Sequence, residues 1–214
     1  MNFRYYNTNK LIGLILVLSV LYNFVFEKIE GAIKTYPFFD KVYSYIGVFS
    51  TISLITLTIL LIDNFLWKWT LFGWKPFGWL IDIPNLNGRY KGKLISSFKI
   101  NGISVEKICV MEIKQTASKF KINSYFGDVS TGITTSKSIS ISEELVKGEN
   151  DTFDLFYNFS NKTAPLLTLA SHEGTALLTY YNDKKLMGEY FNQKNNNGSI
   201  DVEFLQKKLI GRLN

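Results

Sequence analysis

The chain has 214 residues, a formal net charge of +6, one cysteine and one histidine. This length allows one ordinary domain with an appendage and argues against a multidomain enzyme. One cysteine cannot form an internal disulfide, and one cysteine with one histidine cannot supply a structural zinc site. Neither Gly-rich phosphate-loop pattern, GxGxxG or GxxxxGK[ST], is present. We therefore predict no nucleotide hydrolysis, no metal and no cofactor.

The only residue on which a nucleophile–base arrangement could be built is His172. It lies in a short polar stretch, residues 171–174, between two apolar runs, a pattern that predicts a hairpin turn. No nucleophile motif surrounds it. We predict a surface turn residue at this position and a chain that is not an enzyme.

Two stretches in the first third of the chain carry no charged residue. The first, Leu11–Phe26, would form roughly 24 Å of helix, and its flanking tyrosines and the snorkelling Lys10 can extend it to the thickness of a bilayer core. A cleaved signal peptide is the alternative, because a basic start and a short apolar core are present. Since the stretch ends without the small residues of a cleavage site, we predict a transmembrane helix.

The second uncharged stretch, Val42–Ile62, would form roughly 31 Å of helix and is the better candidate for a span. A buried helix of a soluble core would show a polar stripe at helical period, which is missing here. The serine and threonine hydroxyls of this stretch can bond to carbonyls four residues back or face the first helix. We predict a second transmembrane helix.

All four tryptophans follow directly, between Trp67 and Trp79. Indole rings prefer the headgroup level of a membrane, where Lys68 and Lys75 can meet anionic phosphates. The segment therefore predicts an interfacial belt rather than a stacking surface for nucleic acid. Slightly more basic residues flank the two stretches than lie between them, which favours both termini in the cytoplasm.

From about Ile83 onward, short alternating or β-branched stretches are separated by turn residues, as in an antiparallel meander. The strongest turn signal is Asn101-Gly102, which suits a type I′ hairpin turn. Further turns are predicted at residues 127–128, 161–162, 182–183 and 193–198, and residues 143–145 hint at a helical turn. The predicted strands are residues 88–100, 103–116, 119–126, 129–141, 152–160, 164–170, 174–181, 185–192 and 199–206.

Strands without helices to cover a sheet face are best accommodated by closing the sheet. Alternation places Tyr90 and Leu94 on one face and Arg89 on the other. We therefore predict two N-terminal transmembrane α-helices, in residues 1–82, followed by an all-β, roughly eight-stranded antiparallel up-and-down barrel, lipocalin-like, in residues 83–214. A β-sandwich is the alternative.

Short motifs at both ends of the β-rich region match those of a known family. The opening P-x-L-x-G-x-W-x-G is matched, with Tyr in place of Trp, at Pro84, Leu86, Gly88, Tyr90 and Gly92. The closing elements G-x-Y-x-N and G-x-I are matched at Gly188, Tyr190, Asn192, Gly198 and Ile200. With the helix pair, these motifs resemble the two-transmembrane β-barrel effectors of bacterial cyclic-oligonucleotide-based antiphage systems (CBASS). The opening also resembles that of lipocalins, from which the helix pair separates this chain.

The resemblance implies a signalling effector and not an enzyme. In this family a companion nucleotidyltransferase makes a cyclic dinucleotide on infection, and the cytosolic barrel binds it. Protomers then oligomerise and the transmembrane helices disrupt the membrane, so that the infected cell stops growing or dies. The resemblance implies a bacterial inner-membrane protein with two spans and a cytoplasmic barrel. Its implied partners are a cyclic dinucleotide, membrane lipids and further copies of itself, with no DNA or RNA polymer.

A cyclic dinucleotide carries two phosphates and two bases. Its receptor needs cations or N–H groups for the phosphates, and aromatic or amide side chains for the bases. Basic residues, Lys91 among them, and aromatic residues beside amides near strand ends are therefore candidates. The predicted ligand-binding residues are Arg89, Tyr90, Lys121, Tyr125, Tyr157, Asn158, Tyr180, Tyr190 and Asn192. Each tyrosine could instead fill the barrel, because aromatic side chains are ordinary core material in small β-domains.

Two other functions are compatible with the same residues. A membrane-tethered, lipocalin-like carrier would hold an apolar ligand in an apolar barrel interior and would not respond to nucleotides. A structural membrane protein would use the barrel only to dock a partner, for which the evenly mixed surface charge is the single hint.

Overall fold

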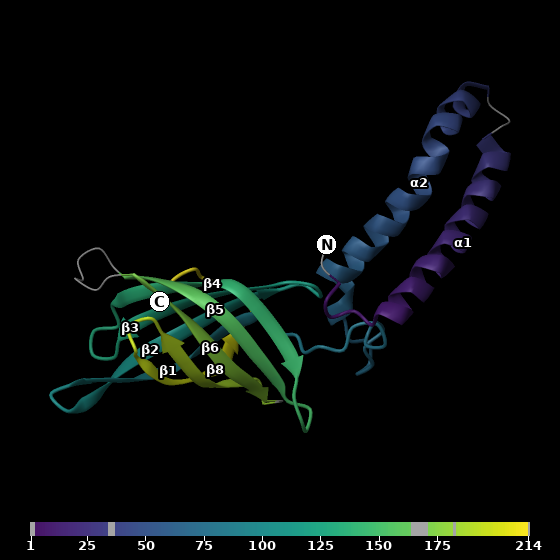
Figure 1. The fold of residues 1–214 in the computed structure, drawn as a ribbon. Coiled ribbons are helices and arrows are strands. Elements are labelled where there is room, and N and C mark those ends of the chain that lie inside the picture. The colour runs from purple at the N-terminus through teal and green to yellow at the C-terminus, as the bar shows by residue number, and fades with distance from the viewer. Residues whose placement is uncertain (1–2, 34–36, 164–170, 182, 214) are drawn as a thin grey trace. The chain divides into compact units, whose positions relative to one another are not determined.

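The computed structural model describes residues 3–33, 37–163, 171–181 and 183–213. The chain forms two compact units (Figure 1). The first comprises Met1–Ile83 with Thr116–Ser118, and the second comprises Pro84–Gln115 with Lys119–Asn214.

Two long helices dominate the first unit. Helix α1 spans Thr8–Ile33, helix α2 spans Pro37–Asn64, and a single 3₁₀ turn, η1, follows at Leu66–Lys68. The two helices lie side by side as an antiparallel pair (Figure 1). The hydroxyls of Tyr22 and Thr58 lie 2.6 Å apart between them.

Two threonine hydroxyls within α2 bond to carbonyls as the sequence predicts. Thr56 and Thr58 donate hydrogen bonds of 2.8 Å to carbonyls four residues back, those of Ile52 and Leu54. Such bonds remove the cost of exposing a hydroxyl to hydrocarbon, because the donor finds its acceptor within the same helix.

Among the described residues, one helix is long and apolar enough to cross a membrane, over Thr8–Ile29 in α1. The described apolar part of α2 is the shorter stretch Thr51–Asn64. Residues 42–62 do lie within a continuous helix, but the side chains of residues 42–50 are outside the described ones. The second span therefore stays a prediction.

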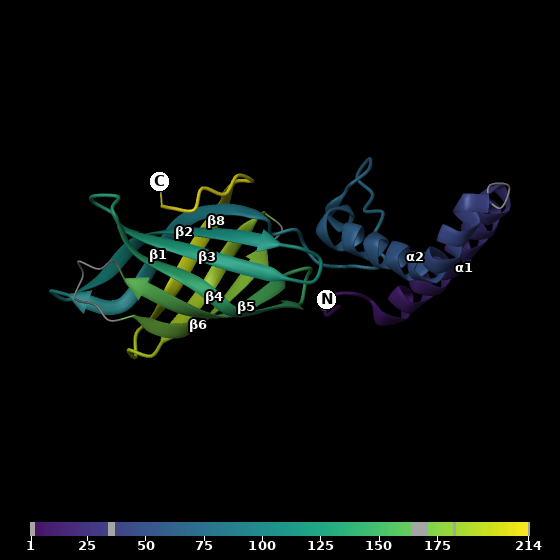
Figure 2. The same ribbon diagram turned by 90° about the horizontal axis from the view of Figure 1, so that it is seen from above.

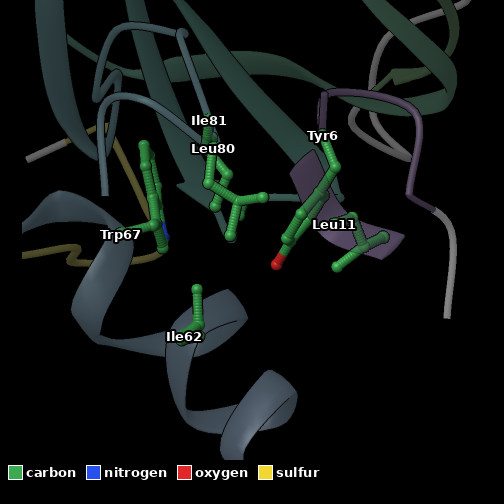
Figure 3. Packing of buried hydrophobic residues seen from close by; sticks show 7 residues of the cluster. Tyr6, Leu11, Ile62, Trp67, Leu80 and Ile81 are labelled. Carbon is green, nitrogen blue, oxygen red and sulfur yellow. The ribbon is translucent and has the colours of Figure 1, made fainter. Parts of the chain in front are cut away.

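A small apolar core joins the helix ends to the segments that pack on them (Figure 3). The buried carboxylate of Asp63 accepts a hydrogen bond of 3.1 Å from the Tyr6 hydroxyl beside this core. Trp67 is part of the core and is buried, which differs from the predicted belt of four interfacial tryptophans, whereas the other three indole rings are exposed. The buried members of the core are Tyr6, Leu11, Ile62, Trp67, Leu80, Ile81 and Ala117.

The second unit is a closed barrel of eight antiparallel strands (Figure 2). Each strand pairs with its neighbour in the chain, and β8 closes on β1. The predicted antiparallel up-and-down barrel is thus confirmed, and the β-sandwich is excluded. The strands are β1 Gly88–Ile100, β2 Ile103–Gln115, β3 Phe120–Asp128, β4 Thr134–Lys147, β5 Phe153–Thr163, β6 His172–Tyr181, β7 Lys185–Asn192 and β8 Asn197–Gln206.

Side chains alternate between the barrel interior and its outer surface, as predicted. On β1, Tyr90 and Leu94 are buried while Lys91 and Lys93 are exposed. On β5, the residues that face inward and are buried are Phe153, Leu155, Tyr157, Phe159 and Asn161.

Several predicted local features are wrong. Residues 143–145 form no helical turn, because β4 runs through them, with a bulge between Ser140 and Ser142. The predicted turns at residues 127–128 and 161–162 lie within β3 and β5, and His172 begins β6. The predicted strand at residues 164–170 lies outside the described residues.

Glycines serve two different purposes in the barrel. At the predicted hairpin turn, Asn101 and Gly102 both adopt positive φ, 51° and 80°, as a type I′ turn requires. Gly92 instead allows close approach of two strands, since a Cβ there would lie 2.0 Å from the Asp201 carbonyl oxygen. A glycine inside a strand, such as Gly92, therefore indicates close approach of another backbone and not a turn.

After β8 the chain folds back against the outer face of β1–β3. We call residues 207–213 the C-terminal strap. Leu213 packs against Val110 and Tyr125, and all three are nearly fully buried. The strap thus covers part of the outer surface of the barrel, a feature that strand alternation does not predict.

Candidate functional site

One end of the barrel opens into a cavity of about 450 Å³, which we call the end cavity. It lies where the β1–β2, β3–β4 and β7–β8 connections meet, because its lining residues come from the strand ends beside those connections. A volume of this size is in the range of small-molecule sites. The lining residues are Leu94, Ser96, Phe98, Ile100, Val105, Lys107, Phe126, Asp128, Thr135, Ser136, Ser138, Tyr157, Phe159, Asn161, His172, Tyr190, Asn192, Lys194, Asn196 and Ile200.

The opposite half of the barrel is filled. Tyr90 is 1% exposed, packs edge-on against Phe204 and donates a hydrogen bond of 3.1 Å to the Leu86 carbonyl. Burial raises the pKa of the Tyr90 hydroxyl well above its ordinary value. Further large side chains that fill the barrel are Met111, Ile113, Ile122, Leu155, Leu178, Leu186 and Val202.

Five aromatic side chains of the described residues line the end cavity, Tyr157 and Tyr190 among them. Burial raises the pKa of both Tyr157 and Tyr190, and hydrogen bonds with Ser124 and Ser96 respectively act in the opposite direction. Both hydroxyls therefore stay protonated at neutral pH. Rings at such positions offer flat faces for a nucleobase.

Two lysines contribute positive charge to the same cavity, Lys107 on β2 and Lys194 in the β7–β8 connection. The Lys107 ammonium lies 3.5 Å from the Asp128 carboxylate, and the Lys107 side chain is 27% exposed. Hydrogen bonds from the Ser130 hydroxyl and backbone N–H lower the pKa of Asp128 to about 2, with a smaller contribution from Lys107. The carboxylate is therefore ionised and able to orient Lys107.

A row of polar side chains crosses three neighbouring strands inside the cavity. Asn161 on β5 stands directly opposite Ser138 on β4 and His172 on β6 in the strand register. The Asn161 amide nitrogen lies 3.4 Å from His172 Nε2. Among the described residues, the buried Oδ1 of Asn161 has no hydrogen-bond partner.

Three of the nine predicted ligand-binding residues line the end cavity, namely Tyr157, Tyr190 and Asn192. Tyr90 and Tyr180 also face inward but lie in the filled half, where Tyr180 pairs with Phe153. The structure therefore brings together only part of the predicted set.

The other four predicted residues are on the outer face. Arg89 is ion-paired with Glu112 at 2.6 Å, and Tyr125 packs under the C-terminal strap. Lys121 contacts the Ser140 carbonyl and the Glu143 carboxylate at the β4 bulge. Asn158 bonds to Ser142 and Thr175, at 3.0 and 2.8 Å.

Sequence reasoning missed several cavity residues, including Phe98, Lys107, Phe126, Asn161, His172 and Lys194. Alternation from Tyr157 along one strand places Phe159 and Asn161 at the next two inward positions. Asn161 was missed because residues 161–162 were interpreted as a turn. His172 was missed because residues 171–174 were also interpreted as a turn.

The observations define a class of protein: a small closed β-barrel with a filled half and an end cavity that combines aromatic, amide and basic side chains. The family model described as "Cap15, cyclic dinucleotide receptor domain" matches residues 81–203. Because this match covers more than half of the chain, the chain belongs to that family, and the resemblance to CBASS effectors is confirmed. No curated protein matches the chain. The matched region contains every residue that lines the end cavity, and the C-terminal strap lies outside it.

The family supports a ligand-binding effector of cyclic dinucleotide signalling rather than a catalyst. Among the described residues, no cluster of three or more His, Cys, Asp or Glu side chains could hold a metal ion.

Proposed function

We propose that this chain is a membrane-anchored CBASS effector that binds a cyclic dinucleotide in its end cavity. The observation that carries the proposal is the receptor-domain match over the strands that form this cavity. The cavity offers both kinds of group that such a ligand needs, cations for phosphates and rings with amides for bases.

In this proposal Lys107 and Lys194 contact the phosphates. Both line the cavity, and the Lys107 ammonium is ion-paired with the Asp128 carboxylate. A charge-assisted hydrogen bond to a phosphate is stronger than a neutral one, so these contacts should contribute much of the affinity. Replacement of both lysines by methionine should weaken binding by at least tenfold.

The aromatic residues of the cavity would hold the bases. Tyr157 and Tyr190 come from β5 and β7, and Phe98 and Phe126 come from β1 and β3. Stacking of a base on such a ring contributes about 1–3 kcal/mol by alanine substitution in other nucleic-acid-binding proteins.

Binding is then proposed to drive assembly of several copies, and the helix pair to disrupt the bacterial inner membrane, with the barrel in the cytoplasm. The apolar Thr8–Ile29 segment of α1 supports membrane insertion. We expect full-length protein to stay with the membrane after a carbonate wash. Release into the supernatant would contradict the membrane anchor. Liposomes that contain the protein should leak an enclosed dye only after the ligand is added.

A membrane-tethered carrier of an apolar ligand is the second candidate, because apolar and aromatic side chains make up much of the cavity wall. Thermal melting of the full chain in detergent discriminates the two. A ligand that binds the native state at one hundred times its Kd adds about 2.7 kcal/mol of stability. Our proposal expects such a shift with at least one cyclic dinucleotide and none with palmitate, and the carrier expects the reverse.

A further inference from the structure

The inward face of β5 places three side chains in a row along the end cavity: Tyr157, Phe159 and Asn161. Phe159 is 8% exposed, and opposite it on β6 stands Gly174. A Cβ at Gly174 would lie 2.5 Å from the Phe159 ring, so the glycine makes the room that this ring occupies. The Phe159 ring therefore lies against Gly174, in the cavity wall, where it can serve as a stacking platform.

The next inward residue, Asn161, is 6% exposed and has an amide oxygen without a hydrogen-bond partner among the described residues. A buried acceptor of this kind costs free energy unless a donor satisfies it. The amide nitrogen lies 3.4 Å from His172 Nε2, so the oxygen is the atom left for another donor.

We infer that Asn161 is a specificity-determining residue that accepts a hydrogen bond from an N–H group on a nucleobase edge while the base stacks on Phe159. This inference rests on the proposed function, and it identifies the β5 side of the cavity as the part that recognises a base. The juxtaposition of an aromatic face and an amide one inward position apart is the arrangement by which proteins recognise an unpaired base.

The experiment measures binding of cyclic di-AMP, cyclic di-GMP and cyclic GMP–AMP to the full chain in detergent by titration calorimetry. The variant Asn161→Leu keeps the size of the side chain and removes its hydrogen-bonding groups. We expect it to weaken binding of the preferred probe by about tenfold or more, and to reduce the differences in affinity among the three probes. The melting temperature without ligand should stay the same or rise, because a buried acceptor without a partner is removed.

The matched control is Ser160→Leu, the neighbouring position on the same strand, which faces outward and should not change binding. Phe159→Leu, which removes the platform, should weaken binding of all three probes. If Asn161→Leu does not fold, Asn161→Ser removes the amide with a smaller side chain.

Equal affinity of the Asn161→Leu and Ser160→Leu proteins for every probe would overturn the inference and leave the proposed function standing. Equal weakening of binding in both variants would also overturn the inference, because any substitution on this strand would then have the same effect as removal of the Asn161 amide. If the unaltered chain binds none of the three probes, the proposed function fails and the inference fails with it.

Discussion

The Arg89 guanidinium lies 2.6 Å from the Glu112 carboxylate on the outer face of the barrel, yet each side chain is only 3% exposed. The C-terminal strap provides this burial. Arg89 donates hydrogen bonds of 2.7 and 2.6 Å to the carbonyls of Arg212 and Leu213. Glu112 accepts from the backbone N–H groups of Ile210 and Gly211. The Arg89–Glu112 pair therefore connects strands β1 and β2 to the C-terminal strap, which follows β8 in the sequence.

We expect Glu112→Gln to lower the free energy of unfolding by about 3 kcal/mol, because it leaves the Arg89 charge buried without its counter-ion. Urea unfolding of the full chain in detergent measures this. The control is Glu106→Gln in the exposed pair with Lys93, 2.7 Å apart, which should cost less than about 1 kcal/mol. Equal costs for the two variants would show that the strap does not bury the pair in solution.

Gly127→Ala should also destabilise the barrel through the strap. A Cβ at this position would lie 2.2 Å from Leu213 Cδ2 and 3.0 Å from the Ile133 carbonyl oxygen. Overpacking of this kind costs about 1–3 kcal/mol. In a chain that ends after Gln206 the main clash is gone, so thermal melting should show a smaller effect of the same substitution. An undiminished effect would contradict the packing of Leu213 on β3.

Cys109 is fully buried, and burial raises the pKa of its thiol to about 12. Since the thiolate is the reactive form, a thiol reagent such as DTNB should not label the native protein at pH 8. Labelling should rise in parallel with urea unfolding, and it reports one site because the chain has a single cysteine. Rapid labelling of the native protein would mean that the barrel opens readily.

The pKa of Asp128, about 2 against an ordinary value of 3.8, gives a pH prediction. A carboxyl group whose pKa is lowered on folding stabilises the native state at every pH above the pKa that the group has in the unfolded chain. That stabilisation is lost as the pH falls through about 2. Asp128 should therefore cause no change in melting temperature between pH 5 and 8.

Removal of the hydroxyl by Ser130→Ala should move the Asp128 pKa upward, toward its ordinary value, in a carboxyl NMR titration. Lys107→Met should raise it less, because Lys107 is the smaller contributor. A larger effect of Lys107→Met would contradict the assignment of causes.

Alternation along the strands predicts which face of the barrel a residue occupies, and this succeeded for Tyr90 and Leu94. It does not predict which end of the barrel is open. Tyr90 and Tyr180 were therefore grouped with cavity residues although they lie in the filled half. Which half of the barrel is filled depends on how side chains from all eight strands pack in the interior, and a local sequence pattern does not predict this packing.

The position of the outer-face candidates away from the end cavity could not be predicted for a second reason. Arg89 and Tyr125 have the chemistry of a ligand site, but the strap that covers them follows the last predicted strand and carries no regular pattern. Lys107 lines the cavity but was not predicted, because a lysine near a strand end has the sequence signature of an ordinary surface residue.

The most direct test of the account fills the end cavity. Ser136→Trp adds an indole to a small side chain that lines it, and Ile139→Trp adds one to the outer face of the same strand. Titration calorimetry with a cyclic dinucleotide that binds the unaltered chain should show no binding to the Ser136→Trp protein and unchanged binding to the Ile139→Trp protein. Unchanged binding to a folded Ser136→Trp protein would contradict the central claim that the ligand enters this cavity.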